Sequence, residues 1–245
     1  MKKTAGLILI IAAASLFRAV DTLPTIGDPQ SPSATHVSPR YIENGPKETG
    51  ATNMVTGVLA DYRGFDTLGE TTVIFTAGLA CLLLLGTTWP NRKAQPDSME
   101  WPFGSAVLEA AIRFSTPFML LFATYVVIHG HDTPGGGFQG GVLYATTLIL
   151  IKLTRGTSIK WGPSPQRALL IASSGLALFS GIGFLSLFFG GSYLDYGVLP
   201  LPFPSSTIRT IGTLGIEIGV ALTVTGVLLL VFEMLTAWHE EEDLQ

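Results

Sequence analysis

Four charged side chains stand within ten residues of one another, where a polar segment meets a long apolar run: Asp61, Arg63, Asp66 and Glu70. Carboxylate oxygens are hard ligands that suit small cations better than nitrogen or sulfur donors do. Asp66 and Glu70, four residues apart, would share a helix face and repel each other unless they are paired, protonated or bound to a cation. The cluster therefore predicts an ion vestibule or a subunit contact. The alternative is a solvated helix cap in which Asp66 precedes the apolar run.

Two further carboxylates lie inside the last apolar run. Glu217 is nine residues into this run, and Glu233 follows 16 residues later, which is about 24 Å along a helix. Ionisable groups inside hydrocarbon are costly, so they usually mark ion paths, proton relays or intramembrane pairs. Glycines around Glu217 predict a face that another helix approaches closely: Gly212, Gly215, Gly219 and Gly226. Glu217 is a candidate for the ion pathway, or else a hydrogen-bonded acid that only fixes packing. Glu233, near the charged end of the chain, is expected to matter less.

A helical acid–base pair is the next candidate. Glu109 and Arg113 are four residues apart, and the glutamate comes first. This order favours an ion pair on one helix face. The pair is therefore a structural salt bridge, or it lines a hydrated path or docks a partner.

A glycine-rich turn follows, in which His129, His131 and Asp132 precede a stretch with five glycines between Pro134 and Gly141. Irregular backbone at membrane depth must be buried in protein or line a cavity, whereas a tight hairpin outside the bilayer has no such need. Histidine titrates near neutral pH and suits proton handling. Because no ligand-like spacing occurs elsewhere, no metal site is expected.

The segments that must position these residues are apolar runs long enough to cross a bilayer. They predict an all-α, polytopic membrane protein with about six transmembrane helices, at 4–17, 53–85 with a break at 61–66, 105–128, 142–153, 168–189 and 208–238. Lys2 and Lys3 before the first run also fit a secretory signal peptide. Arg18 stands where a small-residue cleavage site would be expected, so we predict a retained, short helix.

Positive charge near the spans predicts the orientation. With six helices, eight basic residues fall on one side: Lys2, Lys3, Arg92, Lys93, Lys152, Arg155, Lys160 and Arg167. The other side has four, namely Arg18, Arg40, Lys47 and Arg209. Both termini are therefore predicted to be cytoplasmic.

Composition excludes several classes of function. Of the 245 residues, 47% are hydrophobic and 13% charged, against about a quarter charged in globular domains. The net charge of −4 and the lack of a basic stripe give no reason to expect a nucleic-acid partner. A single cysteine, Cys81, cannot form an internal disulfide or an iron–sulfur site, so no cofactor is expected. Nucleotide-binding glycine motifs and a Ser-His-Asp triad are also absent from the sequence.

Two segments resemble known families. The turn from Gly130 to Gly141, GHDTPGGGFQGG, resembles the signature turn of the MrpB (MnhB) subunit of Mrp-type multisubunit sodium/proton antiporters. The segment from Asn53 to Glu70, NMVTGVLADYRGFDTLGE, resembles a motif at the C-terminal end of the large MrpA subunit. A similar motif occurs in the small E-type subunit of membrane-bound hydrogenases. The chain thus looks like a two-helix module at 1–86, a linker at 87–104 and a four-helix MrpB-like module at 105–245.

The resemblance implies a subunit of the cell (inner) membrane that is not catalytic by itself. Its partners would be large antiporter-like subunits and small membrane subunits that together move sodium and protons. By resemblance, the module with the four clustered charges would help form the sodium-translocating region. The alternative is a structural subunit in the membrane arm of a complex I-related redox complex, such as a hydrogenase with a peripheral arm. Any redox centres would then be on other chains.

Overall fold

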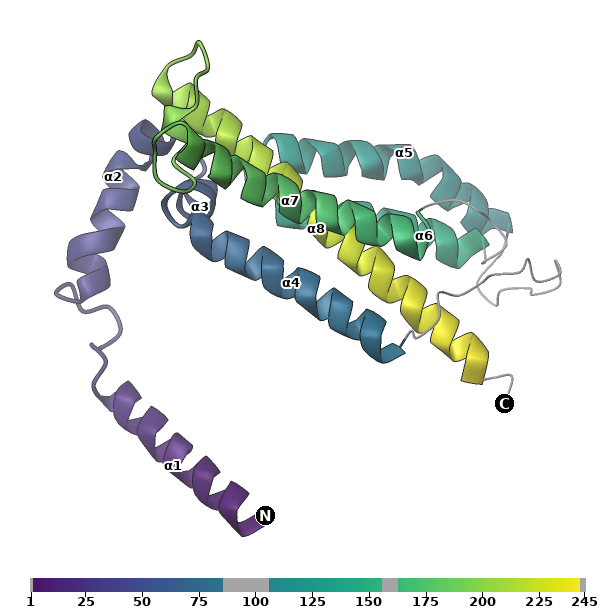
Figure 1. The fold of residues 1–245 in the computed structure, drawn as a ribbon, viewed down its shortest axis with the longest axis horizontal. Helices are drawn as coiled ribbons and strands as arrows, with labels where there is room; N and C mark the ends of the chain where they lie inside the picture. Colours follow the sequence, from purple (N-terminus) through teal and green to yellow (C-terminus); the bar gives the residue numbers. More distant parts are fainter. Residues whose placement is uncertain (1, 86–105, 156–162, 243–245) are drawn as a thin grey trace. The chain divides into compact units, whose positions relative to one another are not determined.

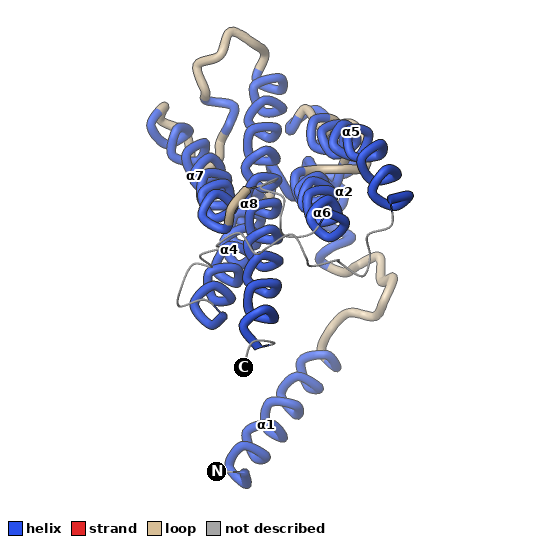
Figure 2. Tube along the Cα trace, turned by 90° about the vertical axis from the view of Figure 1, so that its right-hand side faces the viewer, coloured by secondary structure: helices blue, strands red, loops and turns tan. Residues whose placement is uncertain are grey.

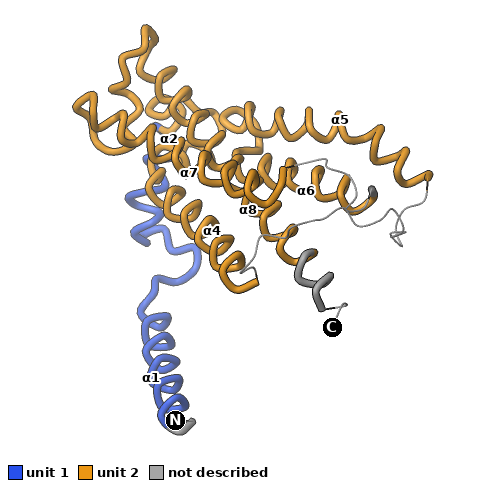
Figure 3. Tube along the Cα trace, turned by 45° about the vertical axis from the view of Figure 1, so that its right-hand side comes forward, with its two compact units in different colours: residues 1–44 blue, residues 45–245 orange. Residues whose placement is uncertain are grey.

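The computed structural model describes residues 2–85, 106–155 and 163–242. They form two compact units, residues 1–44 and residues 45–245 (Figure 3). The first unit holds α1 (Lys2–Asp21), the π-helix η1 (Ser33–Val37) and the start of α2 (Ser38–Thr49). The predicted linker at 87–104 lies outside the described residues.

The second unit is a bundle of five long helices: α4 (Gly64–Leu85), α5 (Ala106–Ile128), α6 (Gly137–Arg155), α7 (Pro165–Phe188) and α8 (Ser205–Glu242). Helix α8 packs against each of the other four, and successive helices alternate in direction (Figures 1 and 2). In its apolar stretch 67% of the residues are buried, against 11–28% in α4, α5 and α7. The core of the bundle therefore lies along α8.

Short elements complete the second unit. Helix α3 (Met54–Thr56) and the π-helix η2 (Gly57–Tyr62) precede α4, and the 3-10 helix η3 (Tyr196–Val198) lies between α7 and α8. Asn53 caps α3, because its side chain accepts a hydrogen bond from the backbone N–H of Val55.

Five helices are long and apolar enough to cross a membrane in the part of the chain that the structure describes, and no strand occurs there. They are α1, α4, α5, α7 and α8, which confirms the prediction of an all-α, multi-pass membrane protein. The remaining predicted span, 142–153, is helical as part of α6. Its glycines, threonines and lysine make α6 less apolar, so it is not among the five.

The glycine face predicted on the last helix receives α7. A Cβ atom added to Gly219 would lie 2.8 Å from the carbonyl oxygen of Gly175, and one added to Gly226 would lie 2.5 Å from the carbonyl oxygen of Ala168. The hydroxyl of Thr223 also donates to the carbonyl of Ala172 across the contact (3.2 Å). Larger residues would separate the two backbones, so these glycines set how closely α7 approaches α8.

Candidate functional site

A cavity of about 320 Å³ lies between the start of α4, the start of α6 and the middle of α8. Its walls are largely apolar, and its polar lining consists of Thr56, Thr67, Glu70, Thr71, Gln139 and Glu217. Two of the predicted ion-pathway residues, Glu70 and Glu217, therefore meet at one cavity although they are 147 positions apart in sequence. None of the described lining residues is basic.

The glycine-rich turn allows the backbone to reach the Glu217 carboxylate. The N–H of Gly137 donates to a carboxylate oxygen of Glu217 at the first residue of α6. A Cβ atom on Gly136 would lie 3.1 Å from that carboxylate, and the φ of +139° at Gly136 is rarely adopted by other residues. An acid at a helix N-terminus satisfies a free N–H group and a favourable dipole. This contact explains why α6 begins at Gly137, whereas the sequence predicted a turn continuing to Gly141.

Oxygen atoms dominate the polar lining on the α4 side. Glu70 is exposed on α4, one residue before buried Thr71. Thr67 donates its hydroxyl to the carbonyl of Leu59 (2.6 Å), which ties α4 to η2. Carboxylate, hydroxyl and amide oxygens without a neighbouring base are a donor set that suits a small hard cation or a proton.

The four clustered charges point to three different places. Arg63 and Asp66 pair with each other at 2.5 Å, and their side chains are 59% and 47% exposed. Asp61 instead turns into the protein, where Arg209 of α8 binds it at 2.7 Å. Only Glu70 reaches the cavity. The π-helical turn of η2 just before α4 changes the phase of the chain, so spacing alone could not place Asp61 relative to Asp66 and Glu70.

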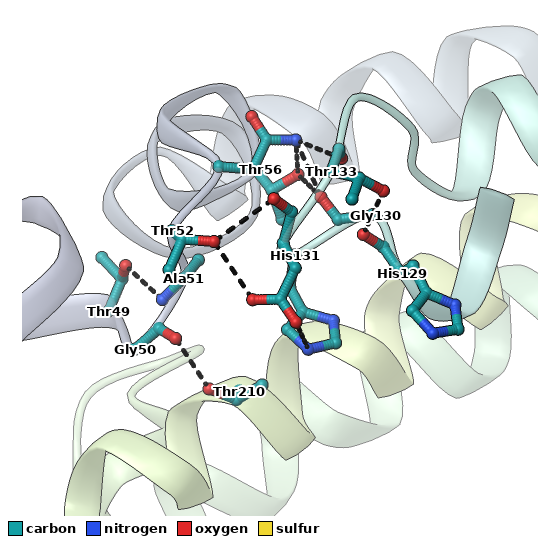
Figure 4. A network of polar contacts seen from close by, with 12 residues as sticks. Thr49, Gly50, Ala51, Thr52, Thr56, His129, Gly130, His131, Thr133 and Thr210 are labelled. Carbon is teal, nitrogen blue, oxygen red and sulfur yellow. Dashed lines mark hydrogen bonds and ion pairs between the residues drawn. The ribbon is translucent and has the colours of Figure 1, made fainter. Parts of the chain in front are cut away.

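The turn before α6 is held by residues of α3 and of the segment just before it (Figure 4). The side-chain amide of Asn53 donates to the carbonyls of Gly130 (2.8 Å) and Thr133 (2.9 Å). Thr56 also donates to the Gly130 carbonyl (2.7 Å), and the N–H of Asn53 donates to the carbonyl of His131 (2.9 Å). The two segments that resemble known families are therefore bound directly to each other.

The two histidines of the turn lie apart from the cavity lining. His131 Nε2 is 3.2 Å from Asp132 Oδ2, and the hydroxyl of Thr52 is 3.1 Å from Asp132 Oδ1. His129 stacks on Tyr125, with 4.3 Å between the ring centroids. The contact of Asp132 with Thr52 links the turn to the segment before α3, and the part of His129, His131 and Asp132 in an ion path stays a prediction.

Glu109 and Arg113 are exposed on α5, away from the cavity lining. Their predicted pairing and their part in an ion path stay predictions.

Two basic residues that pair with acidic side chains of other helices or turns were not among the residues expected to form ion pairs. Lys152 of α6 forms an ion pair with Glu233 of α8, and only 14% and 2% of these side chains are exposed. Arg209 bridges Asp61 and Asp195. Both basic residues are among the loop charges that predict the orientation; without them, seven remain on the predicted cytoplasmic side and three on the other. The one available signal was that Lys152 interrupts an apolar run.

Two family models match the chain. Residues 107–230 match a domain related to the MnhB subunit of Na+/H+ antiporters, and residues 29–102 match the E-type subunit of the MBH family. The chain is 29% identical over 131 residues to the B-type subunit of the Na(+)/H(+) antiporter of Bacillus subtilis (strain 168), which covers 52% of this chain and 90% of the relative. It is also 29% identical over 216 residues to the A/B-type subunit of a probable K(+)/H(+) antiporter of Rhizobium meliloti (strain 1021). That match covers 75% of this chain but only 21% of the longer relative.

Two solved structures share the fold with a TM-score of 0.66 each. One is the membrane-bound sulfane sulfur reductase, an archaeal respiratory membrane complex, with 29% identity, 96% of this chain and 97% of that chain covered. The other is the Mrp complex of Dietzia sp. DQ12-45-1b, with 26% identity, 95% of this chain and 25% of that chain covered.

Proposed function

Because the chain belongs to the family of domains related to the MnhB subunit of Na+/H+ antiporters, we propose that it is a membrane subunit of an Mrp-type multisubunit cation/proton antiporter. It contributes to sodium translocation and to assembly, and it has no transport or catalytic activity alone. Its partners are large antiporter-like subunits and small membrane subunits. The observation that supports this function best is the cavity that joins Glu70 and Glu217.

The physical reason is charge balance inside a membrane protein. Two carboxylates line the cavity without a basic group among the described lining residues. Ionisable groups at membrane depth must be hydrated, protonated or bound to a cation, because an uncompensated charge inside hydrocarbon is costly. A site that is occupied by either Na+ or a proton is what exchange of the two ions requires.

A second candidate rests on the likeness to the sulfane sulfur reductase, which covers nearly all of both chains. In this alternative, the chain is a structural subunit in the membrane arm of a complex I-related redox complex. The subunits that co-purify with the chain separate the two candidates, because flavin, nickel or iron–sulfur chains belong only to the redox arm.

The proposal is tested with the complex that the native chain forms. When the purified complex is reconstituted in vesicles, an imposed sodium gradient should drive proton movement, read from a pH-sensitive dye. The chain reconstituted alone should give no response. An assembled complex without sodium-driven pH change, or one that needs an electron donor for it, would contradict the antiporter proposal.

We further propose that the chain lies in the cell (inner) membrane with both termini cytoplasmic. The excess of basic residues on one predicted side supports this orientation. A cysteine at exposed Pro134, in the glycine-rich turn, should then react with a membrane-impermeant maleimide added outside the cell. Labelling only from the cytoplasmic side would reverse the orientation.

A further inference from the structure

The two carboxylate oxygens of Asp61 have unequal surroundings. Oδ1 accepts a hydrogen bond from Arg209 Nη1 at 2.7 Å. Oδ2 is buried and has no hydrogen-bond partner among the described residues. Only 7% of the Asp61 side chain is exposed. A buried polar atom without a partner is unfavourable, and a charged one is more so.

The charges around Asp61 do not balance. Arg209 is shared, because its second terminal nitrogen binds Asp195 Oδ1 at 2.8 Å. One cation therefore serves two carboxylates. Glu48 of α2 adds a third negative charge nearby, and it accepts a hydrogen bond from the hydroxyl of Tyr62. If Asp61 were neutral, the guanidinium of Arg209 would pair with a single carboxylate, that of Asp195.

Tyr196 also lies next to Asp61 and carries no positive charge. The hydroxyl of Tyr196 donates to the carbonyl of Ala60 (2.8 Å), and burial raises the pKa of Tyr196, so it stays neutral. Burial also raises the pKa of Asp61 above its ordinary value of 3.8, and Arg209 opposes this shift. Burial thus favours the neutral acid at Asp61, whereas Arg209 favours the carboxylate.

We infer that Asp61 is an exchangeable proton site, separate from the Glu70–Glu217 cavity but linked to it. The inferred link rests on the proposed function. Ala60, next to Asp61, lines the cavity, and Arg209 stands on α8 eight residues, about 12 Å, before Glu217. A proton taken from water onto Oδ2 removes the attraction between η2 and Arg209. Its return to water restores that attraction.

The position of Asp61 couples proton binding there to cation binding in the cavity, because both sites include residues of η2 and α8. The cavity wall includes residues of η2 and α8, and the Asp61–Arg209 pair joins the same two elements. Protonation of Asp61 weakens the contact between η2 and α8, whereas ionisation of Asp61 strengthens it. Proton occupancy at Asp61 therefore changes the surroundings of the cation cavity.

The test measures the proton directly on the purified, detergent-solubilised complex. In pH-dependent infrared difference spectra, the native complex should show a protonated-carboxyl C=O band that Asp61→Asn removes. Asp195→Asn takes away a repelling charge and should move the band's midpoint down by about one pH unit. Asp21→Asn, an exposed aspartate of the first unit, is the matched control and should leave the band intact.

The outcomes separate this inference from the proposed function, because the infrared band of the protonated carboxyl group is measured in detergent, without any ion transport. An unchanged band in Asp61→Asn, or an unmoved midpoint in Asp195→Asn, would make Asp61 a permanently ionised anchor and overturn the inference. If Asp61→Asn prevents assembly, the Asp195→Asn midpoint alone decides. A titrating Asp61 in a complex that does not exchange Na+ for protons would refute only the proposed function and the link to it.

Discussion

Glu217→Gln is expected to weaken the apparent sodium affinity of the reconstituted complex by about tenfold or more. The amide keeps an oxygen that can accept the N–H of Gly137, so the start of α6 should stay in place. Only the negative charge is lost. An interaction with a charged group contributes about 1.5–3 kcal/mol, and each 1.4 kcal/mol is a factor of ten in affinity. The measurement is the sodium dependence of pH change in vesicles, with subunit composition checked in parallel.

Glu70→Gln should act in the same direction, and the double variant should lose less than the two single effects combined, because both carboxylates face one cavity. Glu43→Gln, on an exposed part of α2, is the control. Unchanged sodium affinity in an assembled Glu217→Gln complex would reduce Glu217 to a cap for the Gly137 N–H.

The second large effect is expected at the buried pair of α6 and α8. Lys152→Met alone leaves Glu233 charged inside the bundle, and Glu233→Met alone leaves the lysine. Breaking a buried ion pair on one side typically destabilises a protein by about 3–5 kcal/mol, whereas replacing both partners by apolar residues is often neutral. Each single variant should therefore lower the thermal midpoint and the yield of assembled complex. The double Lys152→Met/Glu233→Met variant should restore both.

The double variant also separates stability from transport. If it assembles and exchanges ions normally, the pair serves only to hold α6 on α8. Single variants as stable as the native chain would contradict the burial of the pair. The sequence alone predicts a small effect at Glu233, because this residue lies near the charged end. Its 2% exposure leads us to expect a strong effect on assembly instead.

The helices were predictable because hydropathy along the chain is a local property. The predicted span at 105–128 corresponds to α5, Ala106–Ile128, and the glycine face on α8 was readable from its spacing. The motifs that resemble known families also identified the two segments that meet at Asn53 and Gly130.

The ion pairs were not predictable, because their partners are far apart in sequence. Asp61 and Arg209 are separated by 148 positions, and Lys152 and Glu233 by 81. Spacing on one helix cannot reveal a partner that a different helix supplies. The break near Asp61 was foreseen, but not its π-helical turn, which separates Asp61 from the α-helix that carries Asp66 and Glu70.

The length of α8 has a consequence for where its charges meet the bilayer. The helix continues for 38 residues, about 57 Å, while the hydrocarbon core is about 30 Å thick. An average tilt of about 20° lengthens the path through the core by only a few ångströms. Arg209 and Glu233 are 24 residues apart, about 36 Å along the axis, so the core cannot enclose both. At least one of the two ion pairs of α8 therefore lies at headgroup level, where the protein rather than the hydrocarbon keeps it buried.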